Sequence, residues 1–230
     1  MVTLTRENIR NGFIRKMMEE APPGFRVLSE AELEGSLAGM FPAGRPDGDI
    51  WLFGYGSLIW NPAFHFAERR IGTVRGLHRR FCLWSTMGRG TPERPGLMLA
   101  LDRGGSCRGV AFRIESSQAA EELQIVWRRE MVSHAYIPRW VNVETADGPV
   151  RAITFTINRQ HERYVGRMDD REAAGVIAAA SGRIGRCAEY LENTVQHLHE
   201  LKIADRYMER LLHLTRQACG EAAAQENSPK

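Results

Sequence analysis

Two stretches of this sequence place unusual residue types where they could do chemistry. The first is an apolar run over 50–53 that breaks into Gly54-Tyr55-Gly56-Ser57 and then becomes apolar again. Glycine allows backbone conformations closed to other residues and lets another molecule approach the peptide groups. A loop of this kind after a strand can aim several N–H groups at one ligand oxygen. The pattern indicates a backbone cradle for a polar ligand, with a plain β-bulge or hairpin as the alternative.

This loop does not match the common glycine motifs. A dinucleotide-binding fingerprint needs a third glycine where this chain has Ile59, and no Gly-Lys-Ser/Thr follows as in a P-loop. A hydrolase nucleophile elbow needs Gly-x-Ser-x-Gly, but Ser57 is followed by Leu58 and Ile59. Because no histidine or acid stands in recognisable motif context around Ser57, a covalent serine nucleophile is disfavoured.

The second stretch is a helix, expected over 117–132, whose apolar face includes a carboxylate. That face is defined by Leu123, Val126 and Trp127. Glu130 follows these residues at helical spacing and should point with the buried side. Burial raises the pKa of a carboxyl group, which makes a glutamate usable as a general base. The alternative is a buried ion pair with Arg128, Arg129 or another arginine.

Other polar residues have simpler interpretations. Glu121 and Glu122 stand near the start of the same helix, where the helix dipole stabilises acids. His197 and His199 are two residues apart and do not share a helix face, so no metal site is expected there. The sequence has four cysteines, at Cys82, Cys107, Cys187 and Cys219. Without a Cys-x-x-Cys pair they indicate reduced thiols of a cytoplasmic protein.

The elements that must position these residues are mainly strands followed by helices. Strands are expected at 50–53, 71–77, 80–85, 96–101, 107–114, 139–145 and 150–157. Many short strands with glycine-rich turns favour an α+β fold built on a small barrel or a strongly curved sheet. Helices are expected after Arg167, at 169–180, 187–201 and 204–219.

The composition is that of a globular protein without a membrane span. Of the 230 residues, 43% are hydrophobic and 26% are charged, and no apolar run approaches the roughly 18 residues needed to cross a bilayer. The net charge of +3 is mild, and no basic and aromatic stripe suggests nucleic acid. We interpret 1–48 as an N-terminal extension and linker, 49–219 as one domain, and 220–230 as a flexible tail.

The extension should contain two helices. One is expected over 5–20, ending before the breaker Pro22-Pro23-Gly24. The other should start at the capping-box spacing of Ser29 and Glu32 and continue to about Leu37. The sequence does not assign a role to this extension.

Together these features resemble the ChaC family of γ-glutamylcyclotransferases, which degrade glutathione. Several motifs follow the family's order: Phe53-Gly54-Tyr55-Gly56-Ser57-Leu58-Ile59-Trp60, Gly76-Leu77-His78-Arg79-Arg80-Phe81, Arg89-Gly90-Thr91-Pro92-Glu93-Arg94-Pro95-Gly96, Cys107-Arg108-Gly109-Val110-Ala111 and Trp127-Arg128-Arg129-Glu130-Met131. A late family motif has two parts, and this chain is similar to both, at Ser181-Gly182-Arg183 and Glu189-Tyr190-Leu191. In the family the two parts stand closer together, whereas here residues 184–188 lie between them.

The resemblance implies a γ-glutamylcyclotransferase-like barrel with flanking helices and a helical C-terminal segment. It also implies that the substrate's α-amine attacks its own γ-carbonyl, which closes 5-oxoproline and releases Cys-Gly. Glu130 would take the amine proton and return it to the leaving nitrogen. Since the substrate supplies both reacting groups, neither a cofactor nor a metal is expected.

The resemblance further assigns substrate contacts and partners. The residues implied in binding are Leu52, Phe53, Gly54, Tyr55, Gly56, Ser57, Leu58, Arg89 and Tyr190. Arg79 and Arg80, with Arg89, are candidates for the far carboxylate of Cys-Gly, with a purely structural role in the barrel as the alternative. The expected partner is glutathione, with no nucleic acid and no membrane, in the cytoplasm; the oligomeric state is unknown.

Two other functions remain open from the sequence. The first is a cyclotransferase acting on other γ-glutamyl amino acids or amines, because the same acid and loop would serve them. The second is a non-enzymatic regulator of cation transport. A desolvated Glu130 argues against this regulator, because an adaptor has no use for such a carboxylate.

Overall fold

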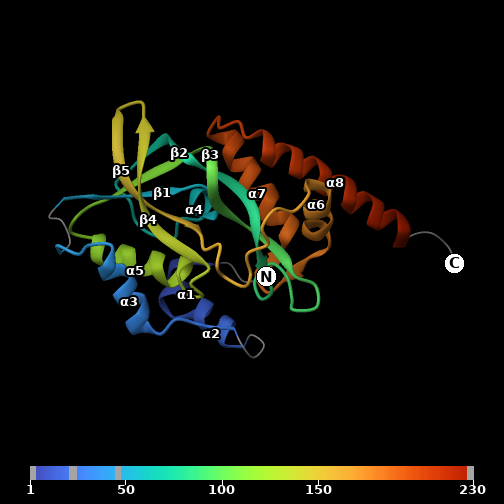
Figure 1. Ribbon diagram of the computed structural model, residues 1–230, viewed down its shortest axis with the longest axis horizontal. Coiled ribbons are helices and arrows are strands. Elements are labelled where there is room, and N and C mark those ends of the chain that lie inside the picture. The colour runs from blue at the N-terminus through green and yellow to red at the C-terminus, as the bar shows by residue number, and fades with distance from the viewer. Residues whose placement is uncertain (1–3, 21–24, 45–47, 227–230) are drawn as a thin grey trace. The chain divides into compact units, whose positions relative to one another are not determined.

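A closed barrel organises the computed structural model, which describes residues 4–20, 25–44 and 48–226. Within these residues the barrel order is β1-β3-β2-β4-β5, with a further pairing between β3 and β5 (Figure 1). The strands are β1 (Ile50–Gly54), β2 (Glu68–Ser85), β3 (Gly96–Ile114), β4 (Tyr136–Thr145) and β5 (Gly148–Ile157). The α+β barrel expected from the sequence is confirmed.

The chain divides into two compact units, which we describe separately. The barrel unit comprises Leu4–Arg80 and Ala100–Tyr164. The helical unit comprises Phe81–Leu99 and the described residues from Val165 onward. Strands β2 and β3 each contribute residues to both units.

Two pairs of expected short strands are in fact single long strands. The expected strands 71–77 and 80–85 are both part of β2, and 96–101 and 107–114 are both part of β3. The glycines inside β3 caused the error, because Gly104 and Gly105 look like a turn in the sequence. Their φ angles of +102° and +66° let the strand bend while it continues.

Helices α3 (Glu30–Gly39) and α5 (Ala119–Glu130) pack in the barrel unit on the outer face of β4 and β5 (Figure 1). The Trp127 ring of α5 meets Phe155 of β5 edge-on at 5.2 Å, and its Nε1 donates to Ser36 Oγ of α3 at 3.3 Å. The capping box expected at Ser29 is present at the start of α3. These contacts fix the direction of α5, and therefore the position of its last residue, Glu130.

The helix expected over 5–20 is two helices, α1 (Arg6–Arg10) and α2 (Phe13–Glu19). Gly12 interrupts it with φ +74°, a left-handed conformation that no helix interior tolerates. The expected breaker Pro22-Pro23-Gly24 lies outside the described residues, as do 45–47 of the expected linker.

Glu122 is a buried carboxylate, which corrects its interpretation as an ordinary first-turn acid. Glu122 is 2% exposed. Its carboxylate accepts from Arg6 Nη2 at 2.8 Å and from the backbone N–H of His65 at 2.9 Å. Glu122 therefore ties the N-terminal helix α1 to the barrel unit.

Glu122→Gln should lower the free energy of unfolding by about 1–3 kcal/mol. Glutamine can still accept from His65, but it leaves the Arg6 guanidinium without its buried counter-charge. Urea unfolding measures the difference. The control is Glu121→Gln, whose wild-type side chain is 56% exposed and should contribute less than about 1 kcal/mol. Equal losses in the two variants would contradict the anchoring role.

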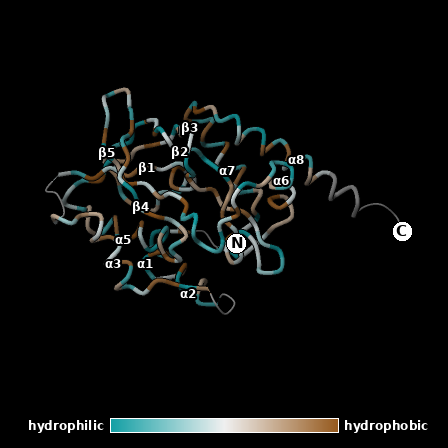
Figure 2. Tube along the Cα trace, in the orientation of Figure 1, coloured by the Kyte–Doolittle hydropathy of each residue, from teal (hydrophilic) through white to brown (hydrophobic). Residues whose placement is uncertain are grey.

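The helical unit contains α6 (Asp170–Ala179), α7 (Cys187–Glu200) and α8 (Arg206–Glu226), with a small sheet of β6 (Ser181–Gly182) and β7 (Gly185–Arg186). Helix α7 buries an apolar face that includes Leu191, Val195 and Leu198. Helix α8 continues past the expected end at Cys219 to Glu226, because 221–226 are mostly alanine and glutamate, which favour helix. Figure 2 shows the alternating hydrophilic and hydrophobic segments of α8.

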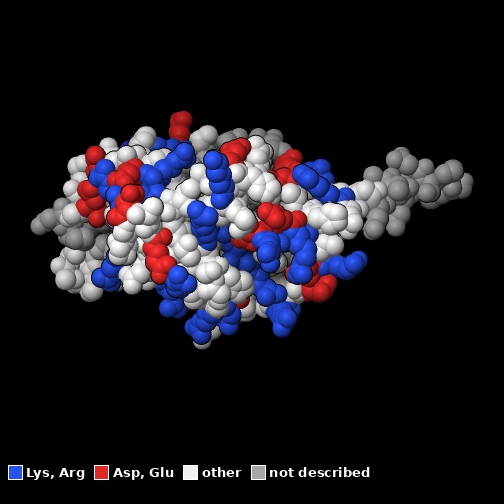
Figure 3. Space-filling model, turned by 90° about the horizontal axis from the view of Figure 1, so that it is seen from above, with Lys and Arg blue, Asp and Glu red and all other residues white. Residues whose placement is uncertain are grey.

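The surface carries charges of both signs. Figure 3 shows basic and acidic side chains on the same face of the molecule, consistent with the small net charge of +3. Among the described residues, no helix combines the length and the apolar character needed to cross a membrane.

Candidate active site

The Gly-Tyr-Gly-Ser loop joins β1 to the short helix α4 (Ser57–Trp60), so it is not a hairpin. Strand β1 lies between two partners: Leu52 pairs with Phe112 of antiparallel β3 and with Ile153 of parallel β5. The loop thus leaves a strand that is held on both sides. This gives the loop a rigid base.

The first glycine of the loop is required by close packing. A Cβ on Gly54 would lie 3.1 Å from both Leu58 Cβ and Phe112 Cε2. Gly56 has φ −137°, outside the left-handed region. The side chains of Leu52, Phe53 and Leu58 are buried in the core. Among the binding residues expected here, these three could therefore offer a ligand only their backbone groups.

Two carbonyl groups, one just before the loop and one within it, are held by the barrel. Phe53 O accepts from Thr154 Oγ1 at 2.9 Å, and Tyr55 O accepts from Arg79 Nε at 2.6 Å. In a planar trans peptide the N–H points opposite to the C=O. The N–H of Gly56 therefore points away from Arg79, which is the geometry that a backbone cradle requires.

Arg79 has a different role from the carboxylate ligand considered for it. The residue is 4% exposed, and its guanidinium also donates to the carbonyl of Arg108. The Arg79 side chain therefore links the loop to β3. The sequence placed Arg79 in a motif but gave no sign of its direction.

Glu130 is the last residue of α5, and its side chain is 14% exposed. Burial raises the pKa of this carboxyl group, and the charge of Arg129 lowers it by a smaller amount. Arg129 Nε lies 3.1 Å from Glu130 Oε1. Among the described residues, Arg129 is the one ion-pair partner of Glu130. The expected burial is confirmed, and so is the ion pair that was considered as its alternative.

Arg129 joins this carboxylate to the loop. Its Nη2 donates to Ser57 Oγ at 2.8 Å, and its Nη1 donates to the carbonyl of Asn61. The Arg129 side chain is only 5% exposed. One buried guanidinium therefore fixes the relative positions of Glu130 and Ser57. Because Ser57 Oγ is an acceptor in this bond, its own O–H can be donated to a ligand.

Arg89 and Tyr190, the other two expected binding residues, lie together in the helical unit. The Arg89 guanidinium stands 5.7 Å from the Tyr190 ring centroid, donates to Arg186 O at 3.1 Å and lies 3.8 Å from Glu189. Burial lowers its pKa. Among the described residues, the buried Arg89 Nε has no hydrogen-bond partner. Tyr190 is 3% exposed and packs edge-on against Phe81.

Comparison with known proteins gives consistent matches. The family model described as ChaC-like protein matches residues 50–218. The glutathione-specific γ-glutamylcyclotransferase of Escherichia coli K12 is 43% identical over 188 residues, which cover 81% of this chain and 81% of that protein. Human glutathione-specific γ-glutamylcyclotransferase 1 is 33% identical over 181 residues, covering 75% of this chain and 79% of the human protein.

A solved structure has the same fold. The crystal structure of a yeast γ-glutamyl cyclotransferase specific to glutathione superposes with a TM-score of 0.69 at 24% identity. The match covers 74% of this chain and 97% of the yeast chain. This likeness supports the barrel topology described above.

Proposed function

The chain belongs to the ChaC-like family, and from that premise we propose that it cleaves glutathione into 5-oxoproline and Cys-Gly. The α-amine of the glutamyl group forms a bond to its own γ-carbonyl carbon. The amide bond to the cysteine nitrogen breaks, and the proton lost by the amine reaches that nitrogen. No water is consumed.

Glu130 is the proposed general acid and base. The substrate's amine is largely protonated at neutral pH, so a carboxylate must accept its proton before ring closure. The same group, now protonated, can supply the leaving nitrogen. The observation that carries this role is the arrangement of one buried guanidinium, Arg129, between Glu130 and the Ser57 hydroxyl.

The loop is the proposed binding element for the glutamyl end. The N–H of Gly56 and the O–H of Ser57 are directed away from the groups that hold the loop, and both can donate to a carboxylate or to the developing oxyanion. Holding the substrate in a curled conformation brings its amine and its carbonyl to reacting distance. This lowers the activation free energy by several kcal/mol.

Arg89 and Tyr190 are a separate proposal for the helical unit. The unpartnered Nε of Arg89 supports a role in binding a substrate carboxylate, because a buried donor without a partner is unfavourable. In the same proposal, Tyr190 would contact the substrate through its hydroxyl group. The boundaries 1–48, 49–219 and 220–230 remain our proposed organisation. The cytoplasm remains the proposed compartment, since all four cysteines are thiols and not disulfides.

The direct test is mass spectrometry of the protein incubated with glutathione. Equal amounts of 5-oxoproline and Cys-Gly are expected. A parallel incubation with γ-glutamyl-alanine should give much less 5-oxoproline. A preference for γ-glutamyl-alanine would identify a cyclotransferase for other γ-glutamyl compounds. Glutathione binding without any product would instead support a non-enzymatic regulator.

Turnover should depend on pH in a defined direction. Burial holds the pKa of Glu130 above its ordinary value, and only the carboxylate form can accept a proton. Therefore kcat/KM for glutathione should fall as the pH drops through this raised pKa, at a pH above the ordinary glutamate value of about 4.3. A pH–rate profile whose acid limb lies at or below that value would contradict the role of Glu130.

A further inference from the structure

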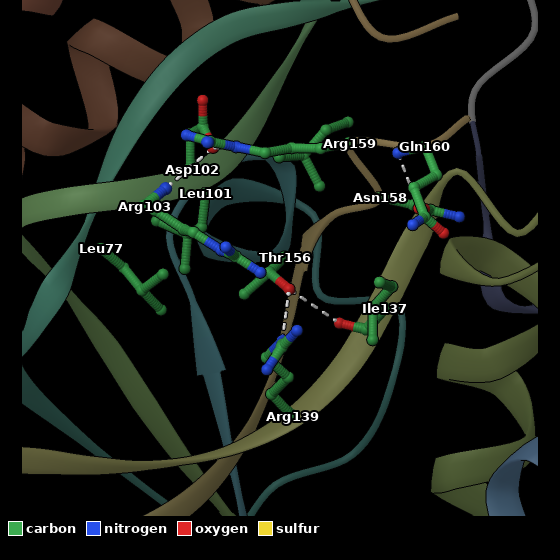
Figure 4. Close-up of a pocket in the computed structure, with 11 residues that line it drawn as sticks. Leu77, Leu101, Asp102, Arg103, Ile137, Arg139, Thr156, Asn158, Arg159 and Gln160 are labelled. Atoms are coloured by element: carbon green, nitrogen blue, oxygen red, sulfur yellow. Dashed lines mark hydrogen bonds and ion pairs between the residues drawn. The ribbon is translucent and has the colours of Figure 1, made fainter. Parts of the chain in front are cut away.

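A pocket lies in the barrel unit, and the proposed reaction does not use it (Figure 4). Its volume is about 470 Å³, within the range of small-molecule sites. Its lining residues come from β2, β3, β4, β5 and the segment that follows β5. Neither Glu130 nor the Gly-Tyr-Gly-Ser loop lines it.

Strand pairing places this pocket at the inner face of the barrel. Ile137 of β4 and Thr156 of β5 are paired and line the pocket from the same face. Thr154, two residues earlier on that face, is fully buried. The opposite face carries Phe155, which packs against Trp127 of the outer helix α5. The pocket is therefore an opening into the interior of the barrel.

Two guanidinium groups in this pocket lack a counter-charge. Arg139 Nε donates to Thr156 Oγ1 at 3.2 Å, and Figure 4 shows Arg103 extending toward the same hydroxyl. The nearby carboxylate of Asp102 is already held by Arg159 Nε at 2.6 Å. Among the residues that the structure describes, neither Arg103 nor Arg139 forms an ion pair. The pocket thus has two positive charges available to a ligand.

Apolar residues line the pocket beneath these charges. They are Leu77, Leu101, Ile137 and Ile157, of which Leu101 is fully buried. We infer that the pocket binds a small organic anion. Its carboxylate or phosphate would lie between Arg103 and Arg139, because a guanidinium donates two parallel hydrogen bonds to such groups. Its carbon chain would pack on these apolar side chains.

Calorimetric titration of the full chain with acetate, butyrate and hexanoate tests both parts of this inference. Affinity should rise by about tenfold or more from acetate to hexanoate as methylene groups are buried. Titration with hexyl phosphate identifies the preferred head group, and inorganic phosphate shows how much the head group contributes alone. The absence of binding by hexanoate and by hexyl phosphate would overturn the inference. Affinity independent of chain length would do the same.

Variants locate the bound anion. Arg103→Gln and Arg139→Gln should each weaken hexanoate binding by about tenfold or more. The control is Arg151→Gln, because Arg151 lies on β5 but stacks on Trp140, away from the pocket. If a variant fails to fold, the NMR signals of the Arg103 and Arg139 Nε–H groups in the wild-type protein should still shift on titration. Unchanged signals would overturn the site.

Glu130→Gln separates this pocket from the proposed reaction. The variant should bind hexanoate as tightly as the wild-type protein, because Glu130 does not line the pocket. Weaker binding would place the anion at the glutathione site and overturn the inference of a separate anion site, while the proposed reaction would stand. Conversely, failure of the wild-type protein to form 5-oxoproline would overturn the proposed reaction and would not contradict anion binding in this pocket.

Discussion

Glu130→Gln should reduce kcat for glutathione by about 10²–10⁴-fold and leave the fold intact. Glutamine has nearly the same volume and can still lie beside Arg129 Nε, so the packing within the pair is kept. What it loses is the ability to take a proton from the substrate's amine. Measurement of 5-oxoproline formation under single-turnover conditions isolates this step from product release.

The stability of this variant provides an independent check. A glutamate whose pKa is raised by folding favours the folded state most at low pH, and this contribution is lost as the pH rises through the raised pKa. At neutral pH the wild-type carboxylate therefore destabilises the protein. Glu130→Gln should unfold at the same temperature as the wild-type protein or higher. Near-normal turnover in a folded variant would exclude Glu130 as the acid and base.

The matched control is Glu121→Gln, which removes a carboxylate from the first turn of the same helix. Its side chain is 56% exposed and lies at the opposite end of α5 from Glu130. Turnover should stay within about twofold of wild type, as for most surface substitutions. Similar losses in both variants would point to helix damage and not to proton transfer.

Arg129→Met should reduce kcat by about 10²-fold and move the acid limb of the pH profile to higher pH. The charge of Arg129 opposes the effect of burial on the pKa of Glu130, so its removal lets that pKa rise further. The variant also releases Ser57, whose hydroxyl is bonded to Arg129 Nη2 at 2.8 Å. The pH–rate profile reports the first effect, and KM for glutathione reports the second.

Two further variants separate charge from geometry. Arg129→Lys keeps the charge and loses the forked contacts, so its acid limb should stay near the wild-type pH while KM rises. Arg128→Met is the neighbouring control, because Arg128 pairs with Glu30 at 3.2 Å on the other side of the helix from Glu130. An Arg129→Met variant with an unshifted acid limb would show that Arg129 has a purely structural role.

The sequence contained the information for the buried side of α5. Helical spacing from Leu123 and Trp127 predicted that Glu130 faces inward, and its side chain is only 14% exposed. Such spacing is local, because helix geometry depends on residues three and four positions apart. The barrel was predictable for the same reason, from the alternation of apolar residues within single strands.

The support of the site was not predictable from local pattern. Arg129 reaches Ser57 across 72 positions of the sequence, and Arg79 reaches Tyr55 across 24. Only the folded barrel brings these residues together, and an arginine in a sequence gives no sign of whether it binds a ligand or a backbone carbonyl. Glu122 was misjudged because its partner, Arg6, lies in the N-terminal extension.

The position of β1 in the barrel also determines when the loop can form during synthesis. Strand β1 has its full set of pairings only when both β3 and β5 lie beside it. Its partners on β5 are Ala152 and Ile153. These contacts span about a hundred residues, and pairings of such high sequence separation form slowly. A ribosome must therefore release nearly all of the barrel before the loop after β1 acquires its rigid base. Until then the nascent chain has the loop sequence but lacks its supporting strand.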